Sequence, residues 1–258
     1  MTGRVTLVGG GPGRADLLTV AAVRALGEAD VVLYDRLAPY EALGEYAPGA
    51  ELVDVGKRPG HHAKPQHEIE ALLVEHALAG RHAVRLKGGD PYVLGRGSEE
   101  VLACHRAGVP VEVIPGVTSA VSVPGAAGIP LTHRGMSHLF TVVSGHAPLT
   151  ESELEHLAGL GGTLVVLMGV NTLPQLTAGL GRFGMSPQMP LAIVERGFRN
   201  DHRTTIADLS DIVFAAGRAH VTSPAVVVIG EVVRLAHDGD AGAAELMDRA
   251  AGFAAVAP

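Results

Sequence analysis

Short runs of β-branched residues alternate with longer segments rich in Ala and Leu along most of this chain. Runs of about four to six residues separated by segments of about twelve are typical of α/β units with largely buried sheets. The predicted strands are residues 5–9, 31–34, 83–86, 111–114, 139–143, 163–168, 191–195 and 225–230. The predicted helices are residues 15–27, 66–78, 98–107, 119–127, 173–181 and 207–216. The alternation therefore predicts an α/β fold.

The alternation is interrupted over residues 126–138, where the chain is rich in turn-forming and charged residues. We place a domain join there. The prediction is an N-terminal α/β domain over residues 1–127 and a C-terminal α/β domain over residues 128–237, each small and with its own sheet. Residues 238–258 are rich in Ala and Gly, and we expect them to form a flexible tail.

Composition excludes several classes of protein. The net charge is −7 with no basic run, and aromatic residues are limited to 5 Phe and 4 Tyr. A nucleic-acid or membrane-surface protein normally carries a basic patch, and a single-stranded nucleic-acid platform needs aromatic faces. No apolar stretch reaches the roughly 18 residues of a membrane span, and the chain opens without a hydrophobic leader. We expect a soluble, cytoplasmic protein that acts on neither nucleic acid nor membranes.

Metal and disulfide chemistry is also disfavoured. The single cysteine, Cys104, excludes an internal disulfide and a multi-cysteine metal site. The 13 histidines are scattered, and the group His61, His62 and His67 lacks the cysteine or carboxylate partners that are typical of a metal centre. We therefore expect no metal ion.

A first glycine cluster, Val8-Gly9-Gly10-Gly11-Pro12-Gly13, follows the first predicted strand. The dinucleotide fingerprint G-x-G-x-x-G fails here, because its third glycine position is Arg14. Pro12 also lacks an amide that could face a pyrophosphate. A nucleotide-like ligand at the strand ends stays plausible, whereas a dinucleotide does not.

A second cluster runs from Arg85 to Glu100 and contains Lys-Gly-Gly-Asp-Pro. Two glycines before Asp90 allow the backbone to approach a ligand closely, while the carboxylate faces a cation or hydroxyl groups. The alternative is an ordinary Gly-Asp-Pro turn. Two further loops, residues 113–120 and 129–134, have a similar character.

Taken together, these motifs resemble the uroporphyrinogen-III C-methyltransferases, within the tetrapyrrole methylases that use S-adenosylmethionine. The resemblance covers residues 4–237 and rests on many motifs in the same order. They are Val-Gly-Gly-Gly-Pro-Gly, Leu-Tyr-Asp-Arg-Leu at 33–37, Gly56-Lys57-Arg58, the block 85–100, Pro-Gly-Val-Thr-Ser-Ala at 115–120, Gly-Ile-Pro-Leu-Thr-His-Arg at 128–134, Val-Leu-Met-Gly at 166–169 and Ser-Pro-Ala-Val-Val-Val-Ile-Gly at 223–230.

The resemblance implies two α/β domains with a cofactor cleft between them, and a homodimer. It implies methylation of uroporphyrinogen III at two ring positions to give precorrin-2. Asp35 would match the family's proposed proton acceptor and Lys57 its proposed proton donor. The residues that would contact S-adenosylmethionine are Pro12, Gly88, Gly89, Asp90, Val93, Thr118, Ser119, Met168 and Gly197.

Such a substrate carries a carboxylate on every side chain, which suits the bias of 17 Arg against 3 Lys in this sequence. The candidates to bind it are Arg36, Arg96 and Arg134, although each could be a solvated surface charge. Glu99 could orient Arg96, face the macrocycle, or be a plain carboxylate at a helix start. Two rival functions stay open: methylation of a later precorrin or cobalt-precorrin, and a non-catalytic nucleotide-binding regulator on the same fold.

Overall fold

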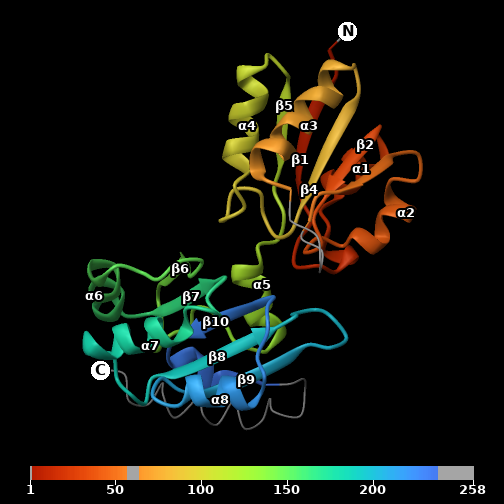
Figure 1. Cartoon of the computed structure of the whole chain (residues 1–258). Helices are drawn as coiled ribbons and strands as arrows, with labels where there is room; N and C mark the ends of the chain where they lie inside the picture. Colours follow the sequence, from red (N-terminus) through yellow and green to blue (C-terminus); the bar gives the residue numbers. More distant parts are fainter. Residues whose placement is uncertain (1, 57–63, 238–258) are drawn as a thin grey trace. The chain divides into compact units, whose positions relative to one another are not determined.

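The computed structural model describes residues 2–56 and 64–237 and divides the chain into two compact units, the first ending at Ser119 and the second beginning at Ala120 (Figure 1). The division lies between residues 119 and 120, whereas the sequence placed the join between 127 and 128. The reason is that Ala120 and Val123 pack with Ala127 in a hydrophobic core of the second unit. The predicted tail, 238–258, lies outside the described residues.

The first unit is built on a parallel five-stranded sheet with the order β3-β2-β4-β1-β5. Its strands are β1 (Arg4–Gly9), β2 (Val31–Tyr34), β3 (Glu51–Asp54), β4 (His82–Lys87) and β5 (Val111–Ile114). All strands run in one direction, so their carboxyl ends share one edge of the sheet, where open α/β sheets bind their ligands.

Helices cover both faces of this sheet. They are α1 (Val20–Gly27), α2 (Leu43–Tyr46), α3 (Gln66–Leu78) and α4 (Gly97–Arg106), with 3-10 turns at Ala15–Leu17 and Tyr40–Ala42. Leu73 of α3 and Cys104 of α4 pack on one face, and Leu26 of α1 and Leu43 of α2 on the other (Figure 1). Burial on both faces explains the nearly continuous apolar strands.

The second unit holds a mixed five-stranded sheet with the order β6-β7-β10-β8-β9. Its strands are β6 (Phe140–Ser144), β7 (Thr163–Leu167), β8 (Pro190–Glu195), β9 (Arg203–Asp208) and β10 (Ala225–Ile229). Its helices are α5 (Ser119–Ala126), α6 (Glu151–Leu160), α7 (Leu173–Arg182) and α8 (Ile212–Arg218), with a 3-10 turn at Glu231–Leu235. β10 is antiparallel to both β7 and β8, so β7 and β8 end at the same edge.

Both units are α/β, which confirms the predicted fold class. Among the described residues, no helix combines the length and the apolar character that a membrane crossing requires.

Cys104 provides a test of the first unit's core. Its side chain is fully buried, and burial raises the pKa of its thiol to about 11. Because the thiolate is the reactive species, we expect iodoacetamide at pH 8 to leave the folded protein almost unmodified, while the protein in denaturant is labelled rapidly. Mass spectrometry of the intact chain measures both. Rapid labelling of the folded protein would show that α4 opens away from the sheet.

Candidate functional site

Three glycine-containing loops meet at the carboxyl edge of the first sheet. They follow β1, β4 and β5 and comprise residues 9–13, 88–90 and 115–119, which we call the glycine loops. The first two pair directly: Gly89 N donates to Gly11 O at 2.7 Å, and Gly11 N donates to Gly89 O at 3.1 Å. The predicted cofactor residues of the first unit lie in or next to these loops, and they are Pro12, Gly88, Gly89, Asp90, Val93, Thr118 and Ser119.

Close backbone approach explains why two of these positions are glycine. A Cβ on Gly9 would collide with the backbone of Gly116, and a Cβ on Gly88 would lie 2.5 Å from Leu37 Cβ. Gly89 is different. Its φ is +68°, and an added Cβ would lie 3.7 Å from Ser119 N, an ordinary contact distance, so a Cβ fits there without a clash. Because glycine has no side chain, the backbone of such a loop stays accessible, and a nucleoside-type ligand can approach it closely.

Asp90 links the loops 88–90 and 115–119 by a hydrogen bond. Its Oδ1 accepts a hydrogen bond from Tyr92 N at 2.8 Å and its Oδ2 accepts one from Gly116 N at 3.0 Å. Val93 N in turn donates to Asp90 O at 3.3 Å. A carboxylate oxygen has about two acceptor positions, so both Asp90 oxygens retain capacity for a ligand hydroxyl. Asp90 therefore combines a loop contact with the chemistry expected of a cofactor residue.

Asp35 lies directly after β2, beside the glycine loops. Its Oδ1 accepts hydrogen bonds from the backbone amides of Leu37 at 3.1 Å, Ala38 at 3.3 Å and Gly88 at 3.3 Å. Its Oδ2 faces Arg85 Nη2 at 3.3 Å, and the side chain is 25% exposed. Gly88 N also lies 3.4 Å from Oδ2, so Oδ1 accepts from three amides, whereas Oδ2 faces Arg85 and has one longer contact with an amide. Oδ2 is therefore the less heavily hydrogen-bonded oxygen of the two.

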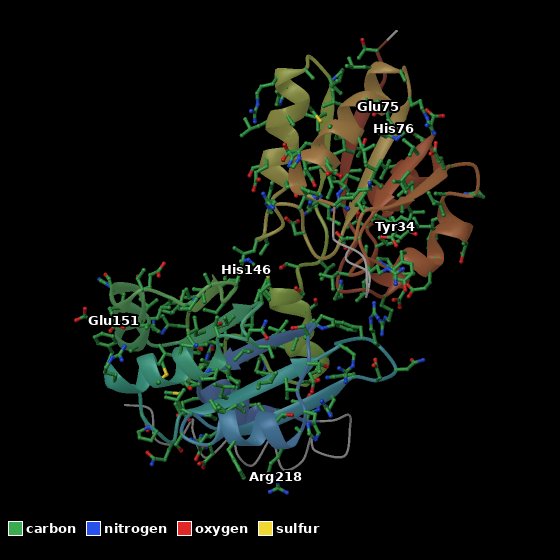
Figure 2. The ribbon with its side chains drawn as sticks, viewed as in Figure 1. Tyr34, Glu75, His76, His146, Glu151 and Arg218 are labelled. Carbon is green, nitrogen blue, oxygen red and sulfur yellow. The ribbon has the colours of Figure 1, made fainter. Side chains whose placement is uncertain are left out.

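The predicted substrate residue Arg36 contacts an acid from the neighbouring strand. Its Nε and Nη2 each lie 3.2 Å from Asp54 Oδ2, and its guanidinium carbon is 5.8 Å from the ring centroid of Tyr40. Tyr40 also stacks on Tyr34, the residue labelled at the end of β2 in Figure 2. Asp54 Oδ1 accepts from Gly56 N at 2.9 Å, immediately before the predicted proton donor Lys57. Lys57 itself lies outside the described residues.

Arg96 and Glu99 form a bidentate pair at the start of α4. The distances are 2.9 Å from Arg96 Nε and 2.6 Å from Nη2 to the two Glu99 oxygens. The hydrogen bond to Arg96 lowers the pKa of the Glu99 carboxyl, and the same bond raises the pKa of Arg96. Both side chains are about half exposed. Glu99 thus pairs with Arg96 and also lies in the first turn of α4, as two of its predicted roles require.

The second unit places Met168 and Gly197 at one edge of its own sheet. Met168 follows β7, is 47% exposed and has a φ of +60°, whereas Gly197 follows β8 and would clash with Val123 if it had a side chain. The residues on either side of Gly197 are also left-handed, with φ of +49° at Arg196 and +66° at Phe198. Such conformations in residues other than glycine are costly and gather at functional loops.

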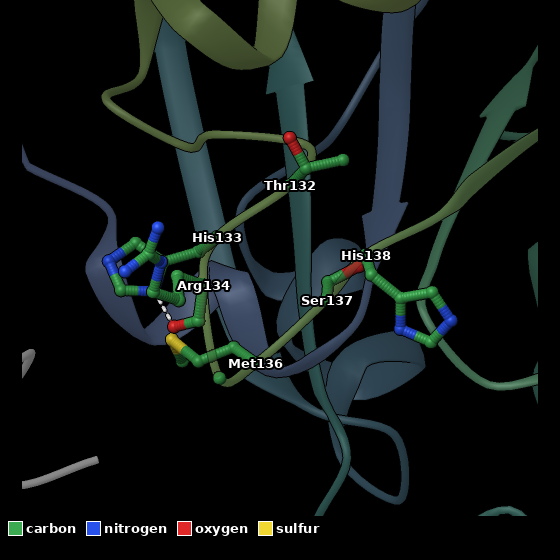
Figure 3. A pocket seen from close by; sticks show the side chains of 7 residues that line it. Thr132, His133, Arg134, Met136, Ser137 and His138 are labelled. Atoms are coloured by element: carbon green, nitrogen blue, oxygen red, sulfur yellow. Dashed lines mark hydrogen bonds between the residues drawn. The ribbon is translucent and has the colours of Figure 1, made fainter. Parts of the chain in front are cut away.

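Arg134 lies on a tight loop around a hollow of about 520 Å³. His133 N donates to Ser137 O and Ser137 N donates to His133 O, both at 2.9 Å, and His133 Nδ1 donates to Arg134 O at 2.8 Å. Figure 3 shows His133 and Arg134 together on one side and His138 on the other. Three side chains that carry or can gain positive charge suit an anionic ligand. The residues that line the hollow are Thr132, His133, Arg134, Gly135, Met136, Ser137 and His138.

Sequence reasoning missed a buried ion cluster beneath the glycine loops, formed by Arg85, Lys87 and Glu100. Their exposed fractions are 4%, 4% and 0%. Burial lowers the pKa of the Lys87 ammonium, and the charge of Arg85 acts in the same direction. The sequence does contain a signal for this cluster. Arg85 and Lys87 lie in or next to a predicted strand that is buried on both faces, and two buried cations require a buried acid nearby.

Within residues 2–56 and 64–237, no group of three or more His, Cys, Asp or Glu side chains is arranged to hold a metal ion. Of the group His61, His62 and His67, only His67 belongs to the described part of the chain.

Comparison with known proteins agrees with the motif order. A family model described as tetrapyrrole (corrin/porphyrin) methylases matches residues 4–213. The chain is 44% identical over 240 residues to the S-adenosyl-L-methionine-dependent uroporphyrinogen III methyltransferase of Methanosarcina barkeri, covering 92% of this chain and 94% of the relative. It is 46% identical over 236 residues to the uroporphyrinogen-III C-methyltransferase of Pseudomonas aeruginosa, covering 91% and 96%. The crystal structure of uroporphyrin-III C-methyl transferase from Thermus thermophilus, complexed with S-adenyl homocysteine, is similar with a TM-score of 0.76 and 46% identity, covering 90% of this chain and 100% of that one.

Proposed function

This chain belongs to the tetrapyrrole (corrin/porphyrin) methylases, and on that premise we propose that it methylates uroporphyrinogen III at two ring carbons, with S-adenosylmethionine as donor, to give precorrin-2. The observation that carries the proposal is identity of 44–46% over nearly the full length of relatives with this activity in their names. The glycine loops at the carboxyl edge of the first sheet support it, because they offer backbone on which a nucleoside can rest.

S-adenosylmethionine, when bound, supplies a methyl group on a positively charged sulfur. The chain's part is to hold that donor and the macrocycle in line, because orientation accounts for much of the acceleration of such a transfer. The residues proposed to hold the donor are Pro12, Gly88, Gly89, Asp90, Val93, Thr118, Ser119, Met168 and Gly197. The left-handed backbone at Gly89 and Met168, each in a loop that directly follows a strand, supports their inclusion.

We propose that Asp35 removes the proton that the macrocycle must lose after each methylation. Its Oδ2 has fewer hydrogen bonds than its Oδ1, and its carboxylate stabilises the positive charge that arises on the pyrrole. Lys57 is the proposed donor of a proton to the macrocycle. This role rests on the family resemblance of Gly56-Lys57-Arg58 alone.

The proposed substrate contacts are Arg36, Arg96 and Arg134, with Glu99 orienting Arg96. Arginine suits this role, because its fork binds a carboxylate with two parallel hydrogen bonds. The hollow beside Arg134 has room for an acidic side chain of the macrocycle, and Arg134 supplies a positive charge there.

The quaternary and cellular setting is part of the proposal. We infer a cytoplasmic homodimer that works without a metal ion and acts on a small molecule rather than on nucleic acid. The family resemblance supports the dimer. The net charge of −7 without a basic run supports the exclusion of nucleic acid.

The direct test is incubation of the purified protein with methyl-labelled S-adenosylmethionine and enzymatically prepared uroporphyrinogen III. Mass spectrometry should show two labelled methyl groups on the macrocycle, with and without a chelator. A parallel reaction offers a later precorrin as acceptor. Faster methylation of that acceptor would reassign the chain to a later step, and no transfer to either acceptor would favour the non-catalytic regulator.

Replacing Arg96 or Arg134 with alanine should lower turnover at low macrocycle concentration about tenfold to a hundredfold, while leaving the affinity for S-adenosylmethionine within about twofold of the unmodified protein. The reason is that each bidentate carboxylate contact is worth about 1.5–3 kcal/mol to substrate binding and nothing to donor binding. The measurements are calorimetry for the donor and initial rates at low macrocycle concentration.

Arg218→Ala is the matched control, because Arg218 is an exposed arginine on α8 that contacts the Phe214 ring (Figure 2). If Arg96→Ala and Arg134→Ala turn over as fast as Arg218→Ala, both arginines are solvated surface charges.

A further inference from the structure

The buried ion cluster reaches the candidate base through a single guanidinium. Glu100 accepts from Lys87 Nζ at 2.9 Å on both oxygens, and its Oε1 accepts from Arg85 Nε at 3.2 Å. Arg85 also donates from Nη2 to Asp35 Oδ2 at 3.3 Å. Arg85 therefore bridges two carboxylates, one fully buried and one at the edge of the glycine loops.

The orientation of the Arg85 guanidinium is set from several sides. Its Nη1 donates to Leu86 O at 2.7 Å and reaches Leu33 O at 3.4 Å, which leaves Nη2 directed at Asp35. The guanidinium is planar and rigid, so a change at one edge moves the opposite edge. Loss of the acceptor at Nε would free the plane to rotate about its two backbone contacts.

The position of Glu100 in the chain makes it suited to hold this arrangement. It lies in the first turn of α4, the helix that follows the glycine loop 88–90, and its partner Lys87 directly precedes that loop. Gln66 at the start of α3 adds a hydrogen bond at 3.3 Å. Glu100 thus joins three elements below the site.

The charges of the four groups balance, with Arg85 and Lys87 positive and Glu100 and Asp35 negative. Charged groups in such a location are costly unless each is paired, and apolar residues usually pack there at least as well. Stability alone is therefore a weak reason for the cluster.

We propose that Glu100 is a positioning residue that acts through Arg85 to hold the Asp35 carboxylate where the methylated macrocycle loses its proton. The proposal rests on the proposed function for its chemistry. It assigns Glu100 no contact with donor or substrate, and it makes the orientation of Asp35 depend on a side chain two contacts away.

The test compares two double variants with the same charge. Lys87→Met/Glu100→Met, the methionine variant, removes the ion pair and the acceptor for Arg85 Nε. Lys87→Met/Glu100→Gln, the glutamine variant, removes the same charges but keeps an oxygen that Arg85 can reach. Replacing both ions keeps the cluster neutral, so neither variant leaves an unpaired buried charge. Thermal unfolding checks that both fold, and Leu73→Ala, in the same core but outside the cluster, reports the effect of lost stability alone.

At saturating donor and macrocycle, the methionine variant should carry out single-turnover methyl transfer about tenfold more slowly than the glutamine variant, the scale expected for a displaced catalytic group. In an Asp35→Asn background the two should react at equal rates, because the group that they position is gone. Two outcomes would overturn the proposal. One is that the methionine and glutamine variants react at equal rates when Asp35 is retained, and the other is that their tenfold difference persists when Asp35 is replaced with asparagine.

Hydrogen exchange supplies a readout that needs no activity. The amides of Leu37, Ala38 and Gly88 donate to Asp35, so they should exchange faster in the methionine variant than in the glutamine variant, while amides within β4 exchange alike. If the unmodified protein transfers no methyl group, the proposed function fails and the exchange difference still decides whether Glu100 holds Asp35. Unchanged exchange at all three amides would overturn the proposal.

Discussion

Replacing Asp35 with asparagine should slow single-turnover methyl transfer about a hundredfold or more, because the transition state loses the carboxylate that stabilises the charge arising on the pyrrole, and the methylated macrocycle loses its base. The amide keeps the size of the carboxylate, and its oxygen can still accept from Leu37 N and Ala38 N, so the loop should keep its shape. What is lost is the charge at Oδ2, where Arg85 now pairs. The affinity for S-adenosylmethionine, measured by calorimetry, should change little.

Asp30→Asn is the control for this variant. Asp30 precedes β2, at the opposite end of the strand from Asp35, and its carboxylate accepts from His82 N at 2.7 Å. It removes a similar charge from the same sheet, and it should leave the rate of methyl transfer intact. A raised Michaelis constant with an unchanged limiting rate would make Asp35 a substrate contact. An unimpaired single-turnover rate in Asp35→Asn would pass proton removal to water or to a substrate carboxylate.

Replacing Gly89 with valine should abolish measurable binding of S-adenosylmethionine, which corresponds to a loss of about a hundredfold or more from an expected micromolar affinity. The residue has a φ of +68°, a conformation that a β-branched residue adopts only at a cost of about 1–3 kcal/mol. An added Cβ would lie 3.7 Å from Ser119 N, an ordinary contact distance, so a clash of that atom with the neighbouring loop is not the cause of the lost binding. The added side chain would instead occupy the room proposed for the donor.

Gly108→Val is the control that separates the effect of backbone strain from the effect of a side chain at the proposed donor site. Gly108 has the same φ of +68° and open space around it, but it lies between α4 and β5, at the amino end of that strand. It should lower the unfolding temperature about as much as Gly89→Val and leave donor binding intact. Equal loss of binding in the two variants would mean that backbone strain alone, and not the position of Gly89, disturbs the site.

Elements whose pattern was strong were predicted well. The helix Gln66–Leu78 and the strands Val31–Tyr34 and Val111–Ile114 have the predicted bounds. The helix predicted over 207–216 was wrong at its start, because Arg203–Asp208 forms the edge strand β9, and a half-exposed edge strand lacks a continuous apolar run. The strand Glu51–Asp54 was missed for the same reason.

Two further differences between the predicted and observed helices are explained by capping residues that are visible in the sequence. The helix Glu151–Leu160 begins with a capping box between Thr150 and Glu153, which the sequence displays as Thr-x-x-Glu. The helix predicted over 15–27 starts only at Val20, because Thr19 accepts a hydrogen bond from Ala22 N and caps it there.

The candidate site was predictable where it depends on strand ends and glycines. Parallel strands deliver Asp35, Gly88 and Ser119 to one edge, so motifs far apart in the chain were bound to meet. Contacts that depend on side-chain direction were not. The bridge of Arg85 between Asp35 and Glu100 needs the register of β4 and the rotation of α4, which the sequence pattern does not specify.

The left-handed residues around the predicted cofactor positions have a consequence for engineering. Leu94, Arg96, Met168, Arg196 and Phe198 all have φ between +49° and +66°. Each holds a side chain in a conformation that glycine adopts without strain. A library screened for heat resistance should therefore enrich glycine or asparagine at these five positions, whereas a library screened for turnover should retain the original residues. Thermal tolerance and catalysis are expected to be selected in opposite directions at the same few codons.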